Sequence, residues 1–199
     1  MSGGYLAMYL GLTYPKEISA IIGAYPMLDV EAPFYNTAFE KRIVGVPTID
    51  PALLENHLQA MDKSRPPPTA ASPPDRLALS FAVIQAGRYL EFLGCHDPRL
   101  FPIKRLDDPV DADGREGGAN LPHMFFFHGE HDSAVPQDGT TLFVSKLKAN
   151  RPKARVLLAL QPGDHGFDAV ADLRATWLHE GINATRKAWR RGNHHLCRF

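Results

Sequence analysis

Residues 121–136 read Leu-Pro-His-Met-Phe-Phe-Phe-His-Gly-Glu-His-Asp-Ser-Ala-Val-Pro, and residues 154–168 read Ala-Arg-Val-Leu-Leu-Ala-Leu-Gln-Pro-Gly-Asp-His-Gly-Phe-Asp. Each stretch contains a short apolar run, Met124–Phe127 or Val156–Leu160, that ends in a polar loop with a glycine. Runs of this length and composition are typical of strands buried on both faces. Residues 137–150 between them have the pattern of a surface helix. The order strand, helix, strand predicts an α/β fold with a mostly parallel sheet flanked by helices.

The loops that follow the two predicted strands carry Asp132 and His165. Ligands of parallel sheets bind beyond the carboxyl ends of the strands, where both residues fall. A histidine acts as a general base when a buried carboxylate fixes its tautomer and stabilises its charged form. Taken singly, Asp132 is better explained as a turn or capping residue and His165 as a surface histidine. Together, at one edge of one sheet, they are a candidate catalytic pair.

The same residues resemble a known family. His-Gly-Glu-His-Asp-Ser-Ala-Val-Pro at 128–136 and Gly-Asp-His-Gly-Phe at 163–167 look like the acid loop and the histidine loop of α/β-hydrolases. These are the esterase and lipase-like proteins whose catalytic triad runs Ser, Asp, His along the chain. The resemblance implies a partial α/β-hydrolase fold, with Asp132 as the triad acid and His165 as the base.

The first residues, Met-Ser-Gly-Gly-Tyr-Leu-Ala, resemble the segment that follows the nucleophile elbow of this family, Gly-x-Ser-x-Gly-Gly. Matching Gly3 and Gly4 to the two family glycines puts Met1 at the nucleophile position. Another register makes Ser2 the nucleophile and Gly4 the required glycine. Ser2 also suits the N-cap of a helix over 5–12. If Met1 were removed, Ser2 would be an N-terminal nucleophile, which the parallel sheet and the acid–base pair do not favour.

The resemblance covers residues 1–30 and about 119–180, the C-terminal half of the family's fold. We therefore expect a hydrolase core at 1–30 and 119–189 that is truncated on its N-terminal side, and a tail at 190–199. Residues 31–118 contain two amphipathic helical stretches, 50–61 and 75–93, around a proline-rich linker. We predict that this region is a helical cap or lid inserted over the active site. An unpaired edge of the incomplete sheet allows a homo-oligomer to form through it.

Composition narrows the possible partners. The 199 residues include 22 basic and 22 acidic side chains, so charge gives no case for nucleic acid or a membrane surface. Neither a bilayer-spanning run nor a secretory signal is visible, and the 2 cysteines make no disulfide framework. We expect a cytoplasmic protein without a cofactor or metal. His128, His131 and Asp132 have ligand types that suit zinc, but the sequence places no clear fourth ligand.

Two hypotheses of function follow. In the first, the chain is a serine hydrolase that cleaves a carboxylic ester or lactone of a small to medium apolar substrate. The serine is Ser2 or a residue upstream of this sequence, and backbone N–H groups hold the oxyanion. In the second, the chain is a catalytically inactive pseudo-hydrolase that binds a ligand or a partner. The sequence upstream of Met1 distinguishes the two hypotheses. An in-frame strand that ends in Gly-x-Ser there would favour the enzyme.

Overall fold

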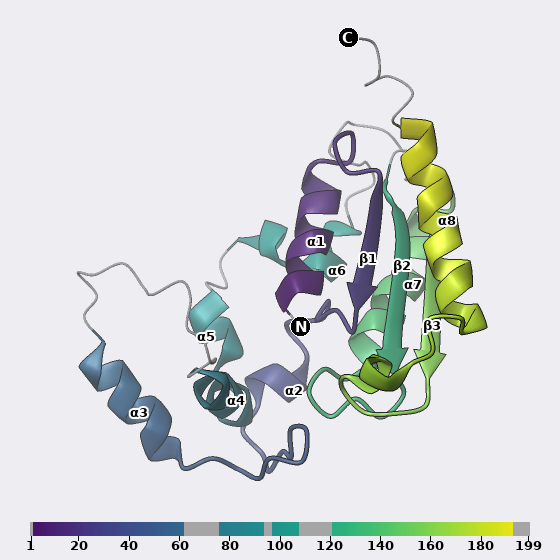
Figure 1. The fold of residues 1–199 in the computed structure, drawn as a ribbon. Helices are drawn as coiled ribbons and strands as arrows, with labels where there is room; N and C mark the ends of the chain where they lie inside the picture. The colour runs from purple at the N-terminus through teal and green to yellow at the C-terminus, as the bar shows by residue number, and fades with distance from the viewer. Residues whose placement is uncertain (1, 62–75, 94–96, 108–120, 193–199) are drawn as a thin grey trace. The chain divides into compact units, whose positions relative to one another are not determined.

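The computed structural model describes residues 2–61, 76–93, 97–107 and 121–192 (Figure 1). The chain divides into two compact units, which we treat separately. The first comprises Met1–Asp29 and His96–Phe199, and the second comprises Val30–Cys95. The first unit contains the sheet and both loops of the predicted site.

Among the described residues, three parallel strands form the sheet of the first unit in the order β1-β2-β3. They are β1 (Ala20–Ala24), β2 (His123–Gly129) and β3 (Val156–Gln161). The register pairs Ala20 with His123 and Met124 with Val156, so the three strands end at the same edge. The predicted strands over Met124–Phe127 and Val156–Leu160 are therefore confirmed, as is the α/β fold class. Burial on both faces was correct for β2 but wrong for β3, whose residues are half-buried or, at Leu157, 36% exposed.

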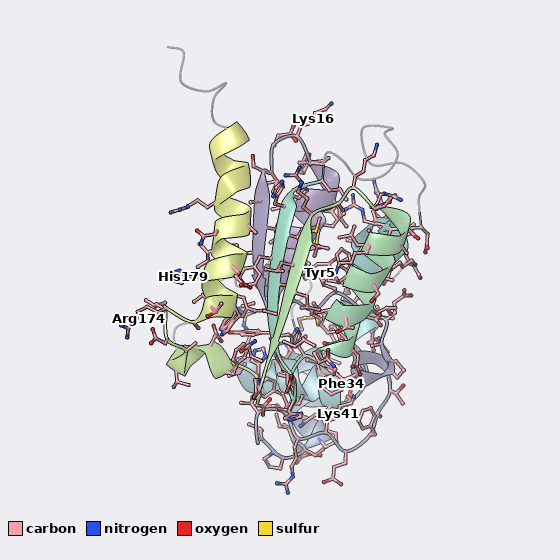
Figure 2. The ribbon with its side chains drawn as sticks, turned by 90° about the vertical axis from the view of Figure 1, so that its right-hand side faces the viewer. Tyr5, Lys16, Phe34, Lys41, Arg174 and His179 are labelled. Carbon is pink, nitrogen blue, oxygen red and sulfur yellow. The ribbon has the colours of Figure 1, made fainter. Side chains whose placement is uncertain are left out.

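Side chains of β2 alternate between two apolar layers, because successive residues of a strand point to opposite faces. Met124 and Phe126 belong to a buried cluster with residues of α1 (Ser2–Thr13) and α7 (Asp138–Asn150). Phe125 and Phe127 instead contact Trp177 of α8 (Thr176–Gly192). The ring centroid of Trp177 lies 6.5 Å from that of Phe125 and 5.4 Å from that of Phe127. Helices thus cover both faces of the sheet, with α8 on one side and α7 on the other (Figure 2).

Helix α1 lies very close to the sheet through its glycines. A Cβ atom on Gly11 would overlap the side chain of Ile21, and one on Gly4 would lie 2.6 Å from Cβ of Pro26. The carboxyl end of α1 is held by Arg105, whose guanidinium donates to Thr13 Oγ1 at 2.9 Å. Arg105 ends α6 (Pro102–Arg105), which follows η1 (Pro98–Leu100). Both short helices lie within the predicted insertion 31–118, yet they cluster with the first unit.

The second unit contains four helices among the residues that are described: α2 (Pro33–Asn36), α3 (Pro51–Ala60), α4 (Leu77–Gln85) and α5 (Tyr89–Leu93). Asp50 caps α3 by accepting the N–H of Ala52 at 2.9 Å. The helix predicted over 75–93 is divided, because Gly87 turns the chain with a φ of 67° between α4 and α5. The predicted linker at 65–74 lies outside the described residues.

The closing helix begins later than the sequence suggests. Apolar residues at helical spacing over 168–187, Val170 and Leu173 among them, predict one closing helix with these residues packed on the sheet. This prediction is wrong: η2 (Phe167–Val170) comes first, and α8 begins only at Thr176. Asp172 accepts the N–H of Arg174 at 2.8 Å, which fixes a turn between the two helices. Val170 and Leu173, expected to pack, are 92% and 79% exposed. The predicted tail at 190–199 is helical as far as Gly192, and residues 193–199 lie outside the described part.

Gly181 tests the packing of α8 on the sheet. A Cβ atom there would overlap the fully buried ring of Phe125. We expect Gly181→Ala to lower the free energy of unfolding by about 1–2 kcal/mol, since overpacking outweighs the better helix propensity of alanine. The matched control is Gly3→Ala, whose Cβ meets nothing within 4 Å and should leave stability equal or slightly higher. Urea unfolding followed by circular dichroism measures both, and equal effects would contradict this packing.

Candidate active site

Asp132 occupies a tight turn directly after β2. Its Oδ1 accepts the backbone N–H groups of Ala134 at 2.9 Å and Val135 at 2.8 Å, so the side chain folds back over its own loop. The residue is only 6% exposed. A buried carboxylate is stable only when it is hydrogen-bonded and paired. This acid loop therefore holds a negative charge in a fixed position at the edge of the sheet.

His165 meets that carboxylate from the loop after β3. Its Nδ1 donates to Asp132 Oδ2 at 2.8 Å and lies 3.1 Å from Oδ1. Because a carboxylate only accepts, Nδ1 carries the proton and Nε2 of the neutral ring keeps a lone pair. Among the described residues no hydrogen bond reaches Nε2, and the side chain is 19% exposed. His165 is thus oriented and available as a base.

The environment keeps Asp132 ionised. Burial alone would raise the pKa of its carboxyl group, but the contacts from His128, His165 and the N–H of Val135 outweigh burial. Their combined effect holds the pKa of Asp132 well below its usual range. At neutral pH the site therefore contains a full negative charge beside His165, which stabilises an imidazolium when one forms.

Asp164, the neighbour of His165, joins the two loops. Its Oδ1 accepts the backbone N–H of Ser133 at 2.7 Å and that of His165, also at 2.7 Å. Both carboxylate oxygens of Asp164 also accept the Ser133 hydroxyl at 2.9 Å. One exposed side chain therefore links the acid loop to the histidine loop.

A glycine at the end of β2 permits this close approach. A Cβ atom on Gly129 would lie 2.6 Å from the carbonyl oxygen of Gly163 and 2.9 Å from that of Asp164. The backbone N–H of His131 donates to the Gly163 carbonyl at 3.0 Å. A larger residue at 129 would separate the loops that carry Asp132 and His165.

His128 has a supporting place in the core. It is fully buried, and its Nε2 donates to the Val135 carbonyl at 2.6 Å while Nδ1 lies 3.2 Å from Thr140 Oγ1. Each ring nitrogen of His128 thus lies within hydrogen-bonding distance of a protein oxygen, and Nε2 also lies 3.4 Å from Asp132 Oδ2. In the described part of the chain, no group of three His, Cys, Asp or Glu side chains is placed to hold a metal ion.

The carboxyl end of β1 also lies beside Asp132 and His165. Tyr25 follows β1, and its ring centroid lies 4.2 Å from that of His165. Next to it, Pro26 is in close reach of Gly4 in the first turn of α1. Ser2 is the first residue of α1, and its side chain is not among those described. The structure therefore brings Asp132 and His165 together and starts α1 at the same edge, while the role of Ser2 stays a prediction.

Comparisons with known proteins fit this arrangement. No protein-family model matches the chain. The chain is 27% identical over 190 residues to a protein named "Probable carboxylesterase M8" from Phoma sp. (strain ATCC 20986 / MF5453), covering 94% of this chain and 57% of that protein. The chain therefore spans little more than half the length of this relative.

Solved structures match over nearly the whole chain. A crystal structure of a protein with unknown function from Staphylococcus aureus subsp. aureus Mu50 aligns with a TM-score of 0.52 and 15% identity, covering 97% of this chain and 61% of that one. An acetyl ester-xyloside bifunctional hydrolase from Caldicellulosiruptor lactoaceticus aligns at 0.39 and 17% identity, covering 95% of this chain and 53% of that one. The chain is thus similar in sequence to a probable carboxylesterase, and its fold is similar to that of the Staphylococcus aureus protein. Asp132 and His165 lie in the loops after β2 and β3, where the sequence placed them, but nothing in the sequence alone indicated the contacts of Asp164 or Tyr25.

The contacts of Asp132 predict how the stability of this protein depends on pH. A carboxyl group whose pKa is lowered by folding adds stability above its unfolded value of about 3.9, and this stability is lost as pH falls towards the folded value. Asp132→Asn lacks this contribution. In urea titrations we expect wild type to exceed Asp132→Asn by about 1–3 kcal/mol at pH 5, and by less at pH 3. A difference that stays constant over this range would contradict the stated environment.

The link made by Asp164 can be tested without any assay of activity. In Asp164→Ala the backbone N–H groups of Ser133 and His165 lose their acceptor. Their hydrogen exchange should accelerate roughly tenfold, the equivalent of one modest hydrogen bond. The N–H of Val135, which donates to Asp132, is the internal control and should keep its protection. Equal acceleration at all three groups would mean that the variant loosens the whole acid loop.

Proposed function

We propose that this chain provides the acid–base pair of a serine hydrolase that cleaves a carboxylic ester or lactone of a small to medium apolar substrate. The main support is the contact of His165 Nδ1 with a buried, ionised Asp132, which leaves Nε2 available. The relative named as a probable carboxylesterase supports ester hydrolysis. Because the chain spans 57% of that relative, the activity of the whole protein belongs to the proposal.

The chemistry needs two half-reactions. His165 Nε2 takes the proton of a serine hydroxyl as its oxygen attacks the ester carbonyl carbon, and Asp132 stabilises the imidazolium that forms. The tetrahedral intermediate collapses, the C–O bond breaks, and the alcohol leaves with the proton from Nε2. Water then attacks the acyl-serine with His165 again as base. The carboxylic acid is released and the serine regains its proton.

Ser2 is our candidate for the nucleophile within this chain. Support comes from the start of α1, where Gly4 approaches Pro26, next to the Tyr25 ring that contacts His165. The first turn of a helix also has backbone N–H groups without helical partners, which suit an oxyanion. In the other register of the family motif, Met1 stands at the nucleophile position.

The second unit, Val30–Cys95, is our candidate for a cap that shapes an apolar substrate pocket. Its helical content and apolar side chains support this role. Within the described residues no helix has both the length and the apolar character needed to cross a bilayer. A cytoplasmic location and self-association through an unpaired edge of the sheet stay predictions from the sequence.

The decisive test is hydrolysis of p-nitrophenyl acetate and butyrate, together with labelling by a fluorophosphonate probe. We expect His165→Ala to lower kcat by at least about a thousandfold, as loss of a triad base does. Ser2→Ala should lower it equally and abolish labelling if Ser2 is the nucleophile. Two matched controls should keep wild-type rates: His131→Ala, an exposed histidine of the acid loop, and Ser145→Ala, an exposed serine of α7.

Each outcome is informative. Loss in His165→Ala with full activity in Ser2→Ala would assign the nucleophile to another serine. A cooperatively folded chain without turnover or labelling would reject the hydrolase for this chain and favour the ligand- or partner-binding pseudo-hydrolase.

A further inference from the structure

Tyr25 has an unusual backbone conformation at the edge of the site. Its φ is 37°, in the left-handed region that residues with a side chain rarely adopt. The residue is nevertheless firmly anchored, because its N–H donates to the Phe127 carbonyl at 2.8 Å and extends the pairing of β1 with β2. Such a conformation costs on the order of 1–2 kcal/mol. A strained backbone conformation that is kept next to a candidate active site indicates that the Tyr25 side chain has a functional role.

The ring of Tyr25 contacts the candidate base. Its centroid lies 4.2 Å from the His165 imidazole at an interplanar angle of 57°. The same ring meets Phe127 edge-on, with centroids 6.3 Å apart at 90°, and lies 6.5 Å from the ring of His128. Tyr25 is therefore fixed by neighbours on β2 while it presents its ring to a residue of the loop after β3.

The Tyr25 phenol is also influenced by the same loop. The carboxylate of Asp168, three residues after His165, acts on the pKa of Tyr25 through its charge and a hydrogen bond. Burial, followed by the nearby charge of Asp168 and this hydrogen bond, raises the pKa of Tyr25 above its ordinary value, so the phenol stays a neutral donor. Tyr25 thus touches the histidine loop at two points, the ring of His165 and the carboxylate of Asp168.

We infer that Tyr25 is a positioning residue, whose ring holds the imidazole of His165 against Asp132. The imidazole has two in-plane nitrogens, and Asp132 binds one of them at 2.8 Å. One such bond leaves the ring free to swing about it. The Tyr25 ring restricts that swing and keeps Nε2 directed towards the reacting atoms, which the effect of orientation on rate requires. An aromatic face also favours the imidazolium formed during reaction.

This inference rests on the proposed hydrolase, so its test has one part that needs no activity. In NMR spectra that correlate the histidine ring carbons with their protons, the ring current of Tyr25 should shift the His165 signals upfield. Tyr25→Leu removes the ring, and the His165 signals should move downfield while those of His131 stay in place. Tyr25→Phe keeps the ring but loses the bond to Asp168, and it should keep the shifted signals.

Kinetics provide the second part. We expect Tyr25→Leu to lower kcat about tenfold to a hundredfold, with KM changed less than about twofold, because a misoriented base affects the transition state more than substrate binding. Tyr25→Phe should restore kcat to within about threefold of wild type. Tyr14→Leu is the matched control, since Tyr14 is 51% exposed beyond the end of α1 and should leave spectra and rates unchanged.

If Tyr25→Leu does not fold, Tyr25→Gly supplies a ring-free protein that accepts the positive φ without strain. Unchanged His165 signals and kcat in either ring-free variant would overturn the inference. If the wild-type chain has no esterase activity but the His165 signals move as described, the hydrolase proposal fails and the positioning contact stands. If kcat and KM change by equal factors, Tyr25 contacts the substrate, and the positioning role is wrong.

Discussion

The buried carboxylate of Asp132 is the interaction on which the site depends. It accepts N–H groups from its own loop at Ala134 and Val135, and it accepts Nδ1–H of His165 from the next loop. A charge removed from water must be compensated by such contacts. The acid loop and the histidine loop therefore stabilise each other. The Asp132 carboxylate alone fixes the ends of β2 and β3 in one geometry.

That geometry relies in turn on the way β2 is buried. Its phenylalanines alternate between the layer of α1 and α7 and the layer of α8, so the strand cannot slip by one residue without exchanging its two faces. Because β1 and β3 are parallel to it, all three carboxyl ends meet at one edge. Gly129 then lets the following loops approach to backbone contact. Packing deep in the sheet thus fixes distances between side chains that lie beyond its end.

Rigid positioning of the histidine is shared among several weak contacts. Asp164 ties the backbone of the histidine loop to Ser133, Tyr25 covers one face of the imidazole, and Asp132 binds its nitrogen. None of these alone fixes an imidazole ring, which turns about its own side-chain bonds. Contacts from three different strand ends restrict it together, which fits the view that functional groups need support from rigid elements around them.

Sequence alone determined features in which the signal is local. The runs 124–127 and 156–160 were recognisable as strands, since they are apolar throughout and bounded by turn residues, although only the first of them is buried. Motifs around Asp132 and His165 were recognisable because the loop chemistry requires those residue types in that order. Local patterns misjudged the closing helix, because apolar residues at Val170 and Leu173 imitate a packed face that the turn at Asp172 removes. Only the tertiary structure decided which residues meet across the edge of the sheet. The contacts of Tyr25 with His165 and of Asp164 with Ser133 depend on strand order, register and close approach, which no short stretch of sequence specifies.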